Sequence, residues 1–168
     1  AEAIAQYEKL IRAAGSDSAR EYYEARVIRA RLRQGDLAGG EKAIRLFAGK
    51  YPKARNDLAA FDVERGGVHF RSGKYAQALP IFQHAAKEFD DAPSAPAALY
   101  WVGLTLEGME KPKDAMDVLV RLVEQYPDAP VIPRSHLALG NLATTLEKWD
   151  EAARQYRRIV DDPAADPA

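Results

Sequence analysis

The sequence has 168 residues, of which 47% are hydrophobic and 29% are charged, and its formal net charge is −1. This balance is typical of a globular chain and excludes intrinsic disorder. The chain contains no cysteine, which excludes disulfides, thiolate nucleophiles and cysteine metal sites. No apolar run approaches the ~20 residues of a membrane span, so direct membrane insertion is not expected.

Charge is unevenly distributed along the chain. Residues 18–55 hold ten basic and four acidic residues, whereas residues 56–168 hold twelve basic and eighteen acidic residues. The sequence therefore predicts a basic N-terminal part and an acidic remainder. Solvated faces and a surface that attracts a partner of opposite charge are both compatible with this pattern. Nucleic-acid binding is not expected, because the acidic remainder would repel phosphates.

Apolar residues recur every three or four positions along almost the whole chain, which is typical of amphipathic helices. Turn sequences such as Gly35-Asp36 and Gly73-Lys74 separate the helical segments. We predict nine helices, in chain order at about 2–14, 18–34, 37–51, 56–72, 75–89, 94–109, 112–126, 131–146 and 149–161.

A repeat runs through these helices. Ala78, Ala115 and Ala152 are spaced 37 residues apart. Each follows a glycine by twelve positions and precedes a large side chain by four, which gives the sets Gly66, Gly103, Gly140 and Phe82, Leu119, Tyr156. Weaker units start earlier, around Gly40 and Ala3. One helix pair cannot bury its apolar face alone, so the pairs are expected to stack. Small residues are expected where paired helices cross, as at Gly103 against Ala115.

Residues 98–127 resemble a tetratricopeptide repeat, with Val102-Gly103, a small residue at Ala115 and a closing Pro127. The resemblance implies an all-α fold, a right-handed superhelical solenoid of antiparallel helix pairs. On this basis the chain is a single array. It divides into a half repeat at 1–15, complete repeats at 18–55, 56–93, 94–130 and 131–163, and a tail or linker at 164–168.

The segments between repeats carry a second resemblance. DAPSAP at 91–96 and DAPVIP at 128–133 lie 37 residues apart. Such long-period repeats are similar to those of the periplasmic coordinator of the Tol–Pal system and of the bacterial outer-membrane assembly lipoprotein. The resemblance implies a bacterial protein of the periplasm or cell envelope. A cytoplasmic location is the alternative, because long-period repeats also occur there.

In tetratricopeptide repeats the first helix of each pair lines the concave face, and partners bind there. Carried over to this sequence, the resemblance implies a protein or peptide partner on the following residues: Tyr22, Arg26, Arg29 and Arg33; Val63, Phe70 and Arg71; Tyr100, Trp101 and Leu104; Arg134, Leu137 and Asn141. The lysine and asparagine positions that grip a C-terminal carboxylate in co-chaperones are not matched, so a chaperone-tail function is not expected.

Two groups among these residues are distinctive. Arg26, Arg29 and Arg33 share one helical face, where like charges repel. They favour a partner with acidic residues, unless solvent or neighbours such as Glu21 and Glu24 neutralise them. Tyr100 and Trp101 are candidate anchors. Adjacent helical residues point about 100° apart, so we expect one of the two to pack between helices.

No catalytic or metal-binding motif is found. His69, His84 and His136 form no His-Glu-x-x-His pattern, and His136 is expected in the interior. We therefore predict a non-catalytic scaffold that needs no cofactor or metal. Two alternatives stay open. One is a self-assembling array that associates through uncapped end helices, such as the face with Ile4, Tyr7, Leu10 and Ile11 or the helix at 149–161. The other is an accessory domain of a larger enzyme or regulator.

Overall fold

The structure is a computed structural model that describes residues 2–161. Within that range the chain forms nine α-helices and no strand. They are α1 (Glu2–Ala13), α2 (Asp17–Arg33), α3 (Leu37–Lys50), α4 (Arg55–Arg71), α5 (Tyr75–Glu88), α6 (Ala95–Gly108), α7 (Pro112–Gln125), α8 (Ile132–Thr145) and α9 (Trp149–Val160). Each predicted helix is confirmed within one residue at either end. The predicted tail at 164–168 lies outside the described residues.

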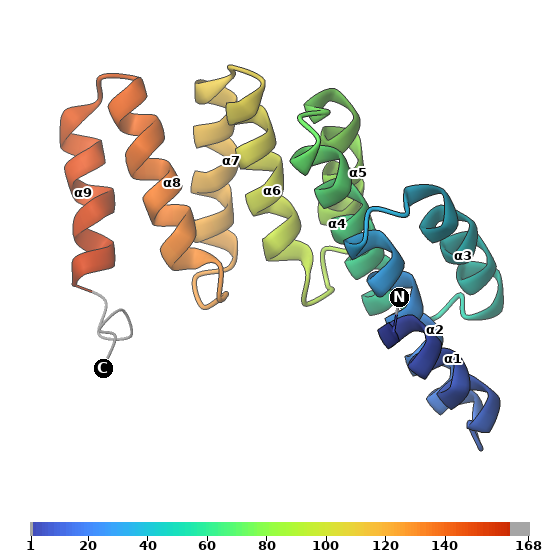
Figure 1. The fold of residues 1–168 in the computed structure, drawn as a ribbon. Helices are drawn as coiled ribbons and strands as arrows, with labels where there is room; N and C mark the ends of the chain where they lie inside the picture. Colours follow the sequence, from blue (N-terminus) through green and yellow to red (C-terminus); the bar gives the residue numbers. More distant parts are fainter. Residues whose placement is uncertain (1, 162–168) are drawn as a thin grey trace.

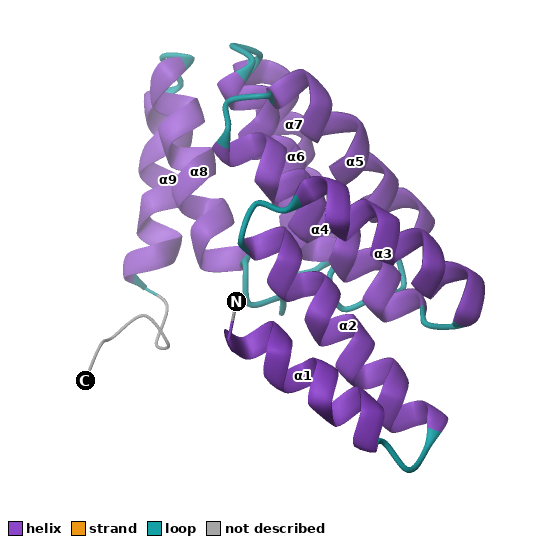
Figure 2. Cartoon of the chain, turned by 45° about the vertical axis from the view of Figure 1, so that its right-hand side comes forward, coloured by secondary structure: helices purple, strands orange, loops and turns teal. Residues whose placement is uncertain are grey.

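The helices are stacked in chain order from α1 to α9 (Figure 1). Each packs against the next along the chain, and the first helices of the pairs, α2, α4, α6 and α8, also contact one another in sequence. In Figure 2 the helices α2, α4 and α6 lie toward the inside of the arc, with α3 and α5 to their right on its outer side. The all-α solenoid is thereby confirmed, with the first helices on its concave side.

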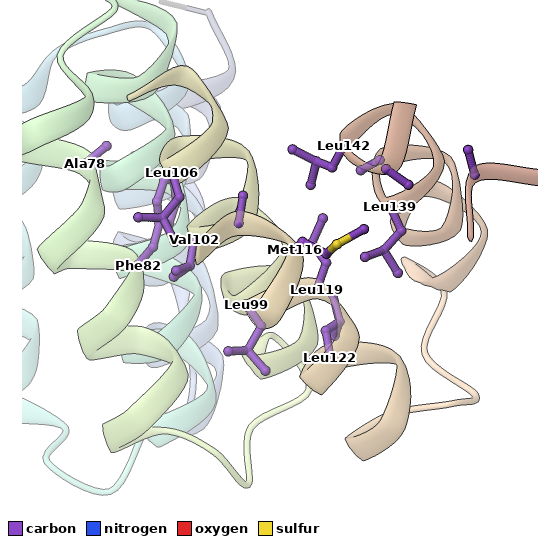
Figure 3. Close-up of a cluster of buried hydrophobic side chains, with 14 residues drawn as sticks. Ala78, Phe82, Leu99, Val102, Leu106, Met116, Leu119, Leu122, Leu139 and Leu142 are labelled. Carbon is purple, nitrogen blue, oxygen red and sulfur yellow. The ribbon is translucent and has the colours of Figure 1, made fainter. Parts of the chain in front are cut away.

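Two clusters of buried side chains hold the stack together. The N-terminal cluster is built around Phe47 of α3 and Phe61 of α4, whose ring centroids are 5.1 Å apart. The larger cluster runs from α5 to α9, and Figure 3 shows Met116 of α7 beside Leu139 of α8 within it. Helix α4 belongs to both, since Phe70 near its C-terminal end packs against the larger cluster.

The repeated glycines lie where helices approach closely. A Cβ atom placed on Gly103 would lie 2.6 Å from Cδ2 of Leu119, and one on Gly66 would lie 2.6 Å from Cε1 of Phe82. Real Cβ contacts are not this short, so only glycine fits without a shift. The expectation of a small residue at the crossing is met. However, the residue nearest Gly103 is Leu119, four residues after Ala115, because the leucine side chain fills the space over the glycine.

The turn inside each helix pair uses a left-handed residue at the same place. Gly35 and Gly73 have φ angles of 82° and 69°, and Glu110 and Glu147 have φ angles of 60° and 57°. Glycine adopts this conformation freely, whereas a side chain with a Cβ is strained by it. The last two turns therefore carry a strain that the first two avoid.

None of the helices within residues 2–161 has the length and hydropathy that a membrane-spanning helix requires.

Candidate partner-binding surface

The predicted partner-binding residues lie on the four first helices, and none is fully buried. Tyr22, Arg33, Arg71, Arg134, Leu137 and Asn141 are exposed, and the others are half-buried. We call this set the concave face. The predicted residues thus share the helices of the inner side of the stack, although they fall into groups with different surroundings.

The arginine row of α2 faces carboxylates of α4. Arg33 donates from Nε and Nη2 to Oε1 of Glu64, at 2.8 and 2.5 Å, and Arg29 Nη2 lies 3.7 Å from the same oxygen. These hydrogen bonds raise the pKa of the Arg33 guanidinium above its ordinary value. The pairing alternative is therefore the one realised. The neutralising acid is Glu64 of the neighbouring repeat rather than Glu21 or Glu24.

A second carboxylate of α4, that of Asp57, also feels the charge of the α2 arginines. Partial burial raises the pKa of Asp57 above its ordinary value, while the charges of Arg29 and Arg26 act in the opposite direction. Arg26 also binds Tyr22 of its own helix, with Nη2 3.0 Å from the phenolic oxygen and the guanidinium carbon 4.9 Å from the ring centroid. Arg29 and Arg33 thus join α2 to α4, whereas Arg26 is held by Tyr22 of its own helix.

Three aromatic residues of the concave face, Phe70, Tyr100 and Trp101, form one cluster. The ring of Trp101 stacks on the buried Phe82 at 5.8 Å and 12°, and meets the edge of Phe70 at 5.1 Å. Trp101 therefore packs between α4, α5 and α6, which confirms that one residue of the pair is used for packing. Burial also raises the pKa of the Tyr100 hydroxyl, with the charge of Arg134 opposing and that of Glu107 adding to the shift.

The remaining part of the concave face is more open. Within residues 2–161 neither Arg71 nor Arg134 makes an ion pair. Leu137 is 49% exposed, and Asn141 Oδ1 accepts a hydrogen bond of 2.9 Å from the hydroxyl of Tyr156. Unpaired guanidinium groups, a leucine and an amide donor are the kinds of group that hold a peptide.

Sequence reasoning missed the cavities on the opposite, outer side of the stack. They lie between successive second helices, with volumes of about 1000 Å³ between α7 and α9, 570 Å³ between α5 and α7, and 540 Å³ between α1 and α3. No predicted concave-face residue lines them. The one feature of the sequence that could have indicated these cavities is a large apolar residue at an outward-facing helical position. Leu46 and Trp149 are examples, with 67% and 63% of their surface exposed.

Two of the three histidines, His84 and His136, pair with side chains of a neighbouring helix. His136 is buried, as expected, and its Nδ1 lies 2.7 Å from Oε1 of Gln155. His84 Nδ1 lies 2.7 Å from Oδ2 of the buried Asp62. In the described part of the chain, no group of three or more His, Asp or Glu residues is arranged to hold a metal ion.

Stacked antiparallel helix pairs, with the first helix of each pair on the concave side, define an α-helical repeat protein. The tetratricopeptide repeat model matches residues 63–130 and 103–168, more than half of the sequence. The chain belongs to the tetratricopeptide repeat family.

Solved structures share the fold. MamA 41-end from Desulfovibrio magneticus RS-1 has a TM-score of 0.66 and 16% identity, covering 100% of this chain and 99% of that one. A MamA RS-1 ArsTM double mutant has a TM-score of 0.66 and 18% identity, covering 95% of this chain and 83% of that one. A Podosopora anserina putative kinesin light chain with nearly identical TPR-like repeats has a TM-score of 0.62 and 13% identity. The match covers 93% of this chain and 83% of that one. No curated protein sequence matches.

Proposed function

We propose that this chain is a non-catalytic scaffold that binds a protein or peptide partner on its concave face. The family supports protein partners in general, since stacked repeats present extended surfaces. The observation that carries the proposal is the open part of the concave face. Tyr100 and Leu104 of α6 and Leu137 of α8 are half-buried or exposed there. Arg71 of α4 and Arg134 of α8 make no ion pair within residues 2–161 and carry the positive charge of this part.

The partner that fits is a segment with acidic groups on both sides of an apolar side chain. Guanidinium groups bind carboxylates through two parallel hydrogen bonds, which fixes orientation as well as adding affinity. Arg29 and Arg33 contribute less, because Glu64 already occupies them. The basic anchors of the proposed site are therefore Arg71 and Arg134, and the α2 arginines are secondary.

The test is a pull-down from a lysate of the source organism with the double variant R71E/R134E. Its control is R121E/R157E, which makes the same change in net charge on exposed positions of the second helices α7 and α9. A partner that the native chain and the control retain, and that R71E/R134E loses, supports the proposal. Retention by all three chains, or loss by both variants, contradicts it.

We also propose a location in the periplasm or cell envelope of a bacterium. What supports it is the pair of inter-repeat segments at 91–96 and 128–133, which are similar to those of envelope proteins. Cell fractionation of the source organism with an antibody against the chain tests the location. Recovery with cytoplasmic markers alone would contradict it.

A further inference from the structure

The outer groove between α1 and α3 differs from the equivalent space one repeat later. In the later space the buried Asp62 of α4 binds Arg65 Nη2 at 2.9 Å and His84 Nδ1 at 2.7 Å. Arg65 Nη1 also lies 4.0 Å from Oε1 of Glu41 on α3. Polar side chains of three helices, α3, α4 and α5, thus pair with one another in the space between α3 and α5.

Two of these positions are apolar in the preceding repeat. Counting back 38 residues, Val27 takes the place of Arg65 and Leu46 takes the place of His84. Glu24, which corresponds to Asp62, therefore has neither partner, and it pairs with Lys50 Nζ at 2.6 Å instead. The network of the later space cannot form here, because valine and leucine carry no polar group.

The α1–α3 groove is open, like the other outer cavities, and its floor is apolar. Its volume is about 540 Å³, within the ~300–1,000 Å³ typical of ligand clefts. Val27, Ile28 and Phe47 form the floor, and Leu46 stands at the lip with 67% of its surface exposed. In the other repeats the position of Leu46 is held by His84, Arg121 and Arg158. Leucine at this position is therefore specific to the α1–α3 groove.

The charge around the groove indicates the partner. Of the charged side chains that line it, Glu8 pairs with Arg31 and Glu24 pairs with Lys50, whereas Lys42 makes no ion pair within residues 2–161. Arg45 is exposed next to Leu46 and adds to this surplus of positive charge. Residues 18–55 as a whole hold ten basic and four acidic residues. A positive rim around an apolar floor favours an occupant with the opposite charge and an apolar side chain.

We propose that the α1–α3 groove is a second docking surface, which takes an acidic segment of another protein and buries one leucine- or phenylalanine-sized side chain against Val27 and Leu46. This surface lies on the side opposite the concave face. It is therefore independent of the partner site proposed above.

The probe is a set of four short fluorescent peptides that carry a central leucine or alanine flanked by aspartates or lysines. Binding by fluorescence anisotropy is expected for the leucine–aspartate peptide. The dissociation constant should rise about tenfold or more in Leu46→Glu and in Lys42→Glu, as at a contact hot spot. Amide signals of α1 and α3 should shift in NMR spectra of the native chain with that peptide.

Arg121→Glu is the matched control, because it places the same carboxylate at the equivalent exposed position of α7. It should bind like the native chain. Leu46 and Lys42 are both exposed. The variants Leu46→Glu and Lys42→Glu are therefore expected to keep the native circular dichroism spectrum and melting temperature. Three results would overturn the proposal: no binding of the leucine–aspartate peptide at millimolar concentration, equal binding by Leu46→Glu, or equal binding of the lysine peptide. A concentration-dependent dimer that Leu46→Glu abolishes would make a second copy the occupant, and would also overturn it.

Discussion

Arg33 of α2 donates two hydrogen bonds to a single carboxylate oxygen of Glu64 on α4. The contact joins two repeats across the concave side. We expect Glu64→Gln to lower the free energy of unfolding by about 0.5–1 kcal/mol, the upper part of the range for ion pairs that are partly exposed. Urea denaturation measures the change, which should shrink in high salt because the charges are screened. Glu124→Gln, at an exposed position of α7, is the control, and an equal loss in both variants would contradict the role of the pair.

The close approach at Gly66 gives a packing prediction. Gly66→Ala should lower the free energy of unfolding by about 1–2 kcal/mol, because the added Cβ overlaps the ring of the fully buried Phe82. Gly49→Ala is the matched control, since no atom lies within 4 Å of a Cβ at that helical position. It should stabilise the chain by up to about 1 kcal/mol through helix propensity alone. Thermal and urea unfolding decide the matter, and the prediction is wrong if both variants change in the same direction.

The left-handed turns predict a stabilising substitution. Glu147 has a φ angle of 57°, so Glu147→Gly should raise the free energy of unfolding by about 0.5–1 kcal/mol by relieving backbone strain. The neighbouring Lys148 has a φ angle of −90°, and Lys148→Gly should bring no such gain. A scanning calorimetry comparison would show the difference as a rise of a few degrees in Tm for the first variant alone.

Asp57 predicts a pH dependence. Because burial raises its pKa in the folded chain, the folded state binds a proton more tightly than the unfolded state. Below the unfolded pKa both states are protonated, and the stability due to this group is fully present. It is lost as the pH rises through the folded pKa. The stability of the native chain relative to Asp57→Asn should therefore fall between about pH 3 and about pH 6. Urea denaturation at both ends of this range checks the sign, and a relative gain on raising the pH would contradict it.

The helices could be predicted from the sequence because the information is local. Apolar residues every three or four positions and a 37-residue period fix the helix boundaries, and the glycine at Gly103 marks a crossing. The identity of the side chain over that glycine depends on side-chain direction within the pair. The three atoms nearest to a Cβ at Gly103 all belong to Leu119.

The surface could be predicted only in part. The arginine row was visible, but its partner Glu64 lies 31 residues from Arg33, and helical periodicity does not say which residues of two stacked helices meet. Likewise, the apolar floor of the groove beside Leu46 contrasts with a polar network that forms one repeat later around Asp62. Such features are visible only when three helices are seen together.

Helix α4 contributes Phe61 to one hydrophobic cluster and Phe70 to the other. If the parts of the stack around these two clusters were independent blocks, they could melt in separate stages. Here, however, unfolding of α4 would break the Phe47–Phe61 and the Phe70–Trp101 contacts together. Coupling between neighbouring repeats makes unfolding cooperative. The two blocks should accordingly share one melting transition, whereas α1, which has no buried residue, is free to detach without cost to either of them.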